Sequence, residues 1–401
     1  MLLFFTPLLI ANLQLGYEVI KIVFFLFMVG VAGIIWFFLS ISKSKDDHKI
    51  RWSLLKTISG LFILVLAITS IYGIDPQTSL IGDYPYYQGL LTYIFLFLAF
   101  IFFSVSKISL KEFSRVFALS ALLVAFLAVS DFILMNLFSR QVVVYSGRIA
   151  STFGQSNFYA GFLLLSLPFA YYLIGQKEKI SFYLGIICLV FTSTGILISG
   201  SRAAILMLGL LVFFWLLSKA PFKKIMVFIS VVVTSAALFA SYYYSAGLVF
   251  KEIIQPRTNQ WLIDNSPEKR VYLWEVLAKL ILQKPYFGYG LENMGVVYSN
   301  FFTSQDINSL KIPYYYSLRN LAVTRSHSYF VDILFFSGIV GLVMWIILLA
   351  VAFLQIRHKK SDLKQPVYLF FAVYVLWSSF QNQSIVHLIY FWSLLGIIDQ
   401  S

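Results

Sequence analysis

Five side chains that could bind and process a phosphorylated substrate lie in the polar segments of an otherwise apolar chain. Arg148, Arg202, Arg270 and Arg325 carry planar guanidinium groups, which bind phosphate oxygens in pairs. His327 closely follows Arg325. Its imidazole, with an unperturbed pKa of about 6.5, can take a proton from a hydroxyl near neutral pH. Together these residue types predict an anion site beside a general base.

Three of these arginines directly precede apolar segments. Arg148 lies near the start of a string, Gly-Arg-Ile-Ala-Ser-Thr-Phe-Gly-Gln-Ser-Asn, that ends at Asn157. Arg202 ends Ser-Gly-Ser-Arg, and Arg325 begins Arg-Ser-His-Ser. A helix that starts at such a place presents free N–H groups and a partial positive charge, which favour phosphate. The alternative for each arginine is that it only reaches to lipid headgroups at the end of a membrane helix.

Arg270 lies in an expected amphipathic helix over 266–282, which starts at a Ser-Pro pair and stops before Pro285. The apolar face of this helix contains Trp274, Leu277 and Ile281. The charged face contains Glu268, Glu275 and Lys279. Arg270 falls in the apolar face, where an unpaired charge is costly. Either Asp264 or Glu292 pairs with Arg270, or the helix lies on the membrane and directs it at a lipid-linked anion.

His327 and Asp332 stand at the entrance of the next apolar segment. The alternative to a general base at His327 is a structural histidine that caps the helix. Asp332 is an acid inside the membrane, a position that by default indicates function, although it could equally pair with Arg325 on the same helix face. No Asp-x-Asp, His-Glu-x-x-His or cysteine-rich motif occurs, so the sequence indicates no metal and no cofactor.

The elements that must position these residues are membrane helices. The chain of 401 residues is 60% hydrophobic and only 12% charged, and long apolar runs recur along it. This pattern predicts an all-α polytopic membrane protein with about twelve transmembrane helices. We expect them over 1–14, 19–41, 53–72, 90–105, 113–137, 157–174, 181–198, 203–218, 225–246, 328–355, 367–380 and 385–398.

Lysines and arginines gather in alternate connections between these helices. The basic set comprises Lys43, Lys45, Lys49, Arg51, Lys56, Lys107, Lys111, Arg115, Lys177, Lys179, Lys219, Lys223, Lys224, Arg357, Lys359, Lys360 and Lys364. The positive-inside rule makes these connections and both termini cytoplasmic, and in a membrane protein such a distribution argues against nucleic acid despite the net charge of +13. The expected domains are therefore 1–246 with nine helices, an extracytoplasmic loop domain over 247–326, and 327–401 with three helices. Cytosolic energy carriers do not reach that loop, so its substrate must already be activated.

The motifs, taken in order, resemble the O-antigen ligase/polymerase superfamily. They are the Arg148 string through Asn157, Ser-Arg-Ala-Ala at Arg202, and Arg270-x-x-x-Trp274 followed by Pro-x-x-Gly-x-Gly-x-Glu-Asn, which contains Glu292 and ends at Asn293. The last is Arg-Ser-His-Ser around His327, with Asp332, Gly338 and Gly341. The chain departs from the family in two places. It has His-Ser where the family usually has His-Asn, and Gly-Gln-Ser-Asn where the family usually has Gly-Asn-Pro-Asn.

This resemblance implies a metal-independent, inverting glycosyltransferase with a GT-C-like membrane fold. It would work at the periplasmic or outer face of a bacterial cytoplasmic membrane, in cell-surface polysaccharide biosynthesis. The donor would be a glycan on a polyprenyl diphosphate such as undecaprenyl diphosphate, and the acceptor a glycan (polymerase), lipid A core of lipopolysaccharide (O-antigen ligase) or protein. The implied catalytic residues are His327, Arg270 and Arg202, and the implied substrate-binding residues are Arg148, Arg202, Arg270, Arg325, Asn157 and Glu292. The alternative is a transporter or flippase of lipid-linked glycan, which needs a polar path across the membrane.

Overall fold

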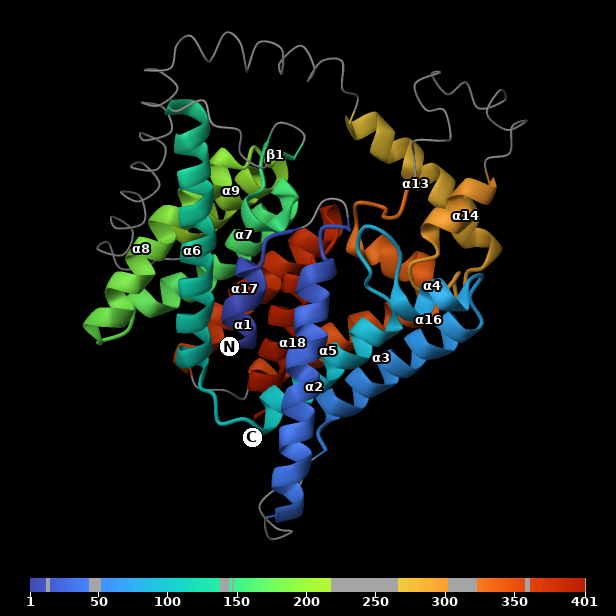
Figure 1. Cartoon of the computed structure of the whole chain (residues 1–401), viewed down its shortest axis with the longest axis horizontal. Coiled ribbons are helices and arrows are strands. Elements are labelled where there is room, and N and C mark those ends of the chain that lie inside the picture. Colours follow the sequence, from blue (N-terminus) through green and yellow to red (C-terminus); the bar gives the residue numbers. More distant parts are fainter. Residues whose placement is uncertain are drawn as a thin grey trace. The chain divides into compact units, whose positions relative to one another are not determined.

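The computed structural model of the chain describes residues 1–11, 15–42, 52–137, 144–145, 148–217, 266–301, 323–357 and 361–400. Among these residues, six helical segments are long and apolar enough to cross a membrane: Val19–Trp36, Leu54–Ile71, Leu110–Met135, Ser156–Ile174, Lys179–Ile198 and Tyr329–Ile356. The protein is therefore a mostly helical, multi-pass membrane protein, as predicted (Figure 1). The number twelve and the large outer loop stay predictions.

Most of the predicted membrane helices have a counterpart of nearly the same bounds. These are α2 (Val19–Ser42), α3 (Leu54–Ile71), α5 (Leu90–Val105), α6 (Leu110–Leu137), α7 (Ser156–Ile174), α8 (Lys179–Ile198), α9 (Arg202–Leu217), α16 (Tyr329–Ile356), α17 (Ser361–Phe380) and α18 (Ile385–Asp399). The helix expected over 225–246 lies outside the described residues. The amphipathic helix is α13 (Ser266–Gln283), and shorter helices are α4 (Pro76–Ile81) and α14 (Met294–Phe301).

Two segments differ from the all-helical expectation. Instead of one helix over 1–14, a four-residue helix α1 (Leu2–Phe5) passes into a 3-10 turn η1 (Thr6–Leu8) that contains Pro7, which cannot donate a helical hydrogen bond. Before α7, β1 (Val144–Tyr145) and β2 (Arg148–Ile149) form a two-stranded antiparallel sheet, followed by the 3-10 turn η2 (Ser151–Phe153).

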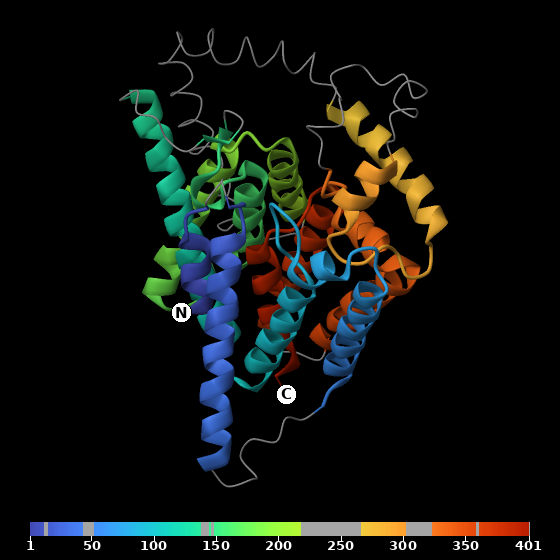
Figure 2. The ribbon, with the colours of Figure 1, turned by 45° about the vertical axis from the view of Figure 1, so that its right-hand side comes forward.

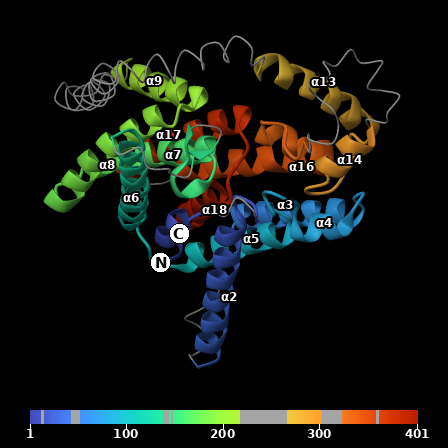
Figure 3. The same cartoon turned by 45° about the horizontal axis from the view of Figure 1, so that its top comes forward.

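The chain divides into two compact units. Unit 1 comprises 1–13, 108–272 and 360–377. Within it α6, α7 and α8 pack side by side (Figure 3). Phenylalanine rings fill the space between the helices, and Phe117, for example, stacks obliquely on Phe162 with 5.4 Å between ring centroids. Two hydrogen bonds hold the segment directly before α7 in place. Thr152 Oγ1 donates to Pro7 O at 2.6 Å, and Ser151 Oγ donates to Val124 O at 3.0 Å.

Unit 2 comprises 14–107, 273–359 and 378–401. In it α18 packs against α5, and α16 packs against α3 (Figure 2). Every residue of α18 is buried, so this helix is the interior of the unit. Its last residue, Asp399, pairs with the buried Lys56 of α3 at 2.5 Å. Each of these two buried charges therefore has a partner of opposite sign inside the unit.

Helix α16 is broken at Gly338, and the loop after α13 fills the break. Gly338 has φ +64°, which removes it from the helix. The N–H groups of Tyr289 and Gly290 donate to Phe335 O and Phe336 O, at 3.0 and 2.8 Å, and Pro285 O accepts from Ile339 N at 2.8 Å. Backbone groups freed by the break are thus satisfied by protein, which is the condition for non-helical backbone at membrane depth.

Replacing Gly338 by Ala should destabilise the protein. A Cβ at this position would lie 2.3 Å from the backbone of Tyr286, and the positive φ is strained for any residue with a Cβ. We expect a lower midpoint of thermal unfolding in detergent, corresponding to a loss of at least about 1–3 kcal/mol. Gly209→Ala in α9 is the matched control, because nothing lies within 4 Å of its Cβ position. An equal midpoint for the two variants would contradict the prediction.

Candidate functional site

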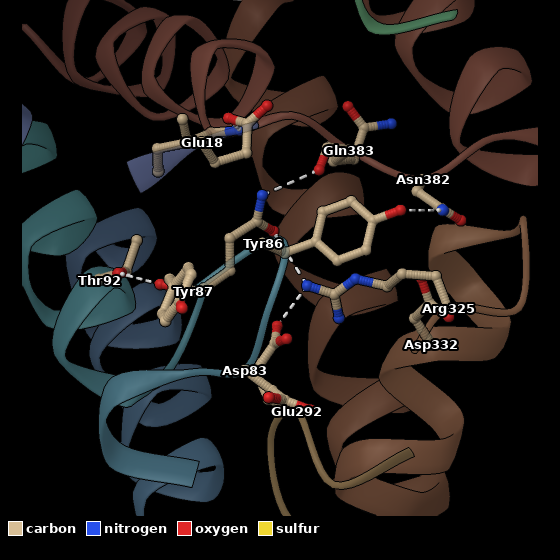
Figure 4. Close-up of polar contacts among 12 residues, drawn as sticks. Glu18, Asp83, Tyr86, Tyr87, Thr92, Glu292, Arg325, Asp332, Asn382 and Gln383 are labelled. Atoms are coloured by element: carbon tan, nitrogen blue, oxygen red, sulfur yellow. Dashed lines mark hydrogen bonds and ion pairs between the residues drawn. The ribbon is translucent and has the colours of Figure 1, made fainter. Parts of the chain in front are cut away.

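Arg325 is the centre of the polar site in unit 2 (Figure 4). Its Nη2 pairs with Glu292 Oε1 and lies 3.4 Å from Gln88 Oε1. The rings of Tyr86 and Phe336 lie 4.7 and 5.2 Å from the guanidinium carbon. The side chains of Arg325 and Glu292 are 7% and 1% exposed. A buried guanidinium is thus held by one carboxylate and by the faces of two rings, an arrangement that strengthens cation–π attraction.

The environment sets the charges of this cluster. Burial raises the pKa of Glu292 to about 7, against the opposing effect of Arg325. Burial also disfavours the charge on Arg325, but Glu292 and Asp332 outweigh it and hold the pKa of the guanidinium above its usual value. Burial raises the pKa of the Tyr86 phenol, whose oxygen accepts from Asn382 Nδ2 at 3.4 Å. Arg325 therefore stays charged, and Tyr86 stays neutral.

His327 lies in a tight turn directly before α16. It is half-buried and has φ +62°. Ser326 N donates to Asp332 Oδ1 at 2.8 Å, and Ser326 Oγ donates to Ser328 O at 2.7 Å. Arg325 and Asp332, which the sequence offered as partners of each other, therefore each bind a different group. Glu292 forms the ion pair with Arg325, and Asp332 accepts the N–H of the turn.

Strained backbone gathers at the predicted residues. Among the described residues, the non-glycine positions with positive φ are Tyr87, Ser151, Glu292 and His327. Two of these are predicted site residues, and Ser151 belongs to the string that contains Arg148. Such conformations persist only where the surroundings enforce them, and they are common at functional sites.

A buried polar chain continues from Arg325 to residues that the sequence did not indicate. Gln88 Nε2 donates to Gln383 O at 3.0 Å, and Gln383 Oε1 lies 3.1 Å from His387 Nδ1. Glu18 Oε2 accepts from Ile385 N at 2.9 Å and so caps the start of α18. Glu18 and Gln88 were missed because each is a single polar residue at the edge of an apolar run. Their burial depends on partners hundreds of positions away.

In unit 1, two predicted arginine motifs meet. Arg148 Nη1 donates to Gly200 O at 3.4 Å and thereby joins β2 to the turn before α9. Gly200 has φ +62°, and a Cβ there would lie 3.3 Å from Arg148 Cδ. Arg202, the first residue of α9, is exposed, and Asn157 lies half-buried in the first turn of α7.

The structure thus places the predicted residues in groups. Arg148 and the turn that precedes Arg202 come together in unit 1. Glu292, Arg325 and the turn of His327 come together in unit 2. The backbone of Arg270 lies in α13, as predicted, and its side chain lies outside what the structure describes. Asp264, one of the two carboxylates that the sequence offered as a partner of Arg270, also lies outside the described residues.

Comparisons with known proteins support the resemblance that the motifs indicated. The "ComP-specific O-oligosaccharyltransferase" of Acinetobacter baylyi is 24% identical over 234 residues, which is 57% of this chain and 39% of that protein. The chain thus spans about two fifths of that relative's length. The O-antigen ligase family model matches residues 187–346, which include Arg202, Arg270, Glu292, Arg325 and His327. This stretch of the chain therefore matches the O-antigen ligase family, the family that the motifs of the chain resemble.

Proposed function

We propose that this protein is a membrane glycosyltransferase that moves a glycan from a polyprenyl diphosphate carrier to an acceptor hydroxyl at the outer face of the bacterial inner membrane. The observation that carries the proposal is the His327 turn, which lies next to a buried, charged Arg325 within the stretch matched by the O-antigen ligase family. The GT-C-like architecture, about twelve helices and metal independence are parts of the same proposal.

In the proposed reaction, the acceptor oxygen attacks the anomeric carbon of the donor glycan while the bond from that carbon to the diphosphate oxygen breaks. His327 takes the acceptor proton as the new bond forms. Attack from the face opposite the leaving group inverts the anomeric centre. The diphosphate departs with its bonding electron pair, and Arg148, Arg202 and Arg270 stabilise the charge that grows on it. The acceptors compatible with this step are a growing glycan, lipid A core and a protein hydroxyl.

Arg325 and Glu292 have complementary parts in this proposal. In the described residues the hydrogen bonds of Arg325 involve Nη2, which Glu292 and Gln88 hold. Glu292 thus orients the guanidinium of Arg325. The other N–H groups of this guanidinium bind the diphosphate in the proposed complex. Asn157, in the first turn of α7, would add an amide donor beside a helix N-terminus.

The test uses purified protein, a polyprenyl-diphosphate oligosaccharide and EDTA, with the products resolved by mass. A ladder of longer lipid-linked chains identifies a polymerase. Single transfer to added lipid A core or protein, with release of polyprenyl diphosphate, identifies a ligase. If folded protein releases no polyprenyl diphosphate with any acceptor, the transferase proposal is wrong. Transport of the lipid-linked glycan, measured in vesicles, is then the alternative. If transfer stops in EDTA and returns when a metal ion is added, the proposed metal independence is wrong.

Arg270→Lys should lose most transfer activity, by about tenfold or more. Lysine keeps the charge but lacks the planar fork that binds two phosphate oxygens. The measurement is the rate of polyprenyl diphosphate release at equal protein levels. Lys279→Arg, on the exposed face of the same helix, is the matched control and should leave the rate unchanged. Full activity of Arg270→Lys would remove Arg270 from the proposed diphosphate clamp.

A further inference from the structure

Helices α13 and α16 and the turn itself all hydrogen-bond to Ser326, directly before His327. Trp274 Nε1 of α13 donates to Ser326 O at 2.8 Å. Ser326 N donates to Asp332 Oδ1 of α16 at 2.8 Å, and Ser326 Oγ donates to Ser328 O at 2.7 Å and accepts from Ser328 N at 3.1 Å. The N–H, the carbonyl and the hydroxyl of Ser326 are therefore all engaged. We call this arrangement, made by Trp274, Ser326 and Asp332, the turn clamp.

The turn clamp holds the two peptide planes that flank His327. Ser326 O belongs to the peptide before His327, and Trp274 fixes it. Ser328 N belongs to the peptide after His327, and Ser326 Oγ fixes it. With both planes held, the backbone of His327 is kept at φ +62°, a conformation that costs free energy and persists only when neighbours enforce it. The direction in which the imidazole leaves the backbone follows from these fixed planes.

Trp274 differs in this respect from other tryptophans of the same unit. Within the described residues, the buried Nε1 atoms of Trp345 and Trp392 have no hydrogen-bond partner, so these rings act as apolar packing. Trp274 is only half-buried and directs its N–H at Ser326 O. The neighbouring Leu273, Val276 and Leu277 are buried and fix α13 in place. The helix is thus anchored by its leucines and valine, and the indole N–H is available to hold the turn.

We propose that Trp274 is a positioning residue for the proposed general base. Its indole N–H fixes the Ser326 carbonyl and through it the place of His327, without touching the reacting atoms. This inference rests on the proposed function, because it assigns a role relative to His327 in glycosyl transfer.

The first test measures the turn clamp without any reaction. Trp274→Phe keeps an aromatic ring but removes the donor. Hydrogen exchange followed by mass spectrometry on a peptide that covers 323–330 should become about tenfold faster, because the turn loses a hydrogen bond that holds it closed. Trp392→Phe is the matched control, since it removes a buried indole N–H without a partner among the described residues. Exchange of this peptide that is equal in wild type and Trp274→Phe would overturn the proposal.

The second test measures transfer in a mutant cycle with His327→Ala. Trp274→Phe should lower kcat about tenfold to a hundredfold with the KM for the donor unchanged, because a small misplacement of a catalytic group is costly. In the His327→Ala background, the same change should have no effect on the residual rate. An undiminished kcat, or an equal loss in both backgrounds, would overturn the positioning role. If His327→Ala alone keeps full activity, His327 is not the base, and Trp274 then has no base to position. The hydrogen-exchange result on the turn clamp would still stand in that case.

Discussion

His327→Ala is expected to lower the rate of glycan transfer by about a hundredfold to ten-thousandfold, the range that a positioned general base contributes. The acceptor hydroxyl is a weak nucleophile until its proton leaves, and in the described site His327 lies in a fixed turn beside the charged Arg325. The diphosphate is already a good leaving group, so the proton is the part of the reaction that most needs help. The measurement is kcat with a polyprenyl-diphosphate oligosaccharide and a defined acceptor.

Two controls separate chemistry from folding in this experiment. His358→Ala changes a histidine that the sequence assigns to a basic cytoplasmic connection, so it should leave kcat unchanged. Added imidazole should restore part of the rate of His327→Ala, since the vacated place can admit a free base. Transfer at the wild-type rate by His327→Ala, at normal membrane levels, would contradict the proposed base.

Much of the helical framework follows from apolar run length. The mostly apolar run over 90–105, which lies between Gly89 and Ser106, predicts α5 with the bounds that the structure gives. Helix α13 was predicted for a different reason, the Ser-Pro start and a 3.6-residue period. Its pattern is confirmed by the buried Leu277 and the exposed Glu275 and Lys279. Local signals of this kind need no knowledge of partners.

Partners could not be predicted in the same way. From the sequence, Asp332 was a possible partner of Arg325 because the two are close in the chain. In the structure Arg325 forms its ion pair with Glu292, and Gln88, from far earlier in the sequence, also contacts it. The choice depends on how α16 and the loop after α13 meet. That arrangement rests on the break at Gly338, where loop and helix exchange backbone hydrogen bonds. Residue types therefore indicated the chemistry of the site, and packing between distant segments decided which groups pair.

Glu292→Ala should be the most destabilising of the substitutions considered at this site. It leaves the guanidinium of Arg325 buried without its carboxylate, and removal of one partner of a buried ion pair costs about 3–5 kcal/mol. Tyr86 and Phe336 offer ring faces but no charge, so they cannot replace the carboxylate. We expect a large drop in the midpoint of thermal unfolding in detergent. Glu292→Gln, which keeps an acceptor oxygen, should fall between Ala and wild type.

Glu178→Ala provides the matched control for the loss of an ion pair. Glu178 pairs with Lys111 and Arg115 in unit 1, but its side chain is 41% exposed, against 1% for Glu292. Water solvates Lys111 and Arg115 once the carboxylate is gone, so Glu178→Ala should leave the unfolding midpoint nearly unchanged. A double variant, Glu292→Leu with Arg325→Met, removes both buried charges and should be more stable than Glu292→Ala, because no unpaired ion remains. If Glu292→Ala unfolds no earlier than Glu178→Ala, the carboxylate is not what holds Arg325 in the site, and its charge must be met by water or by an anion instead.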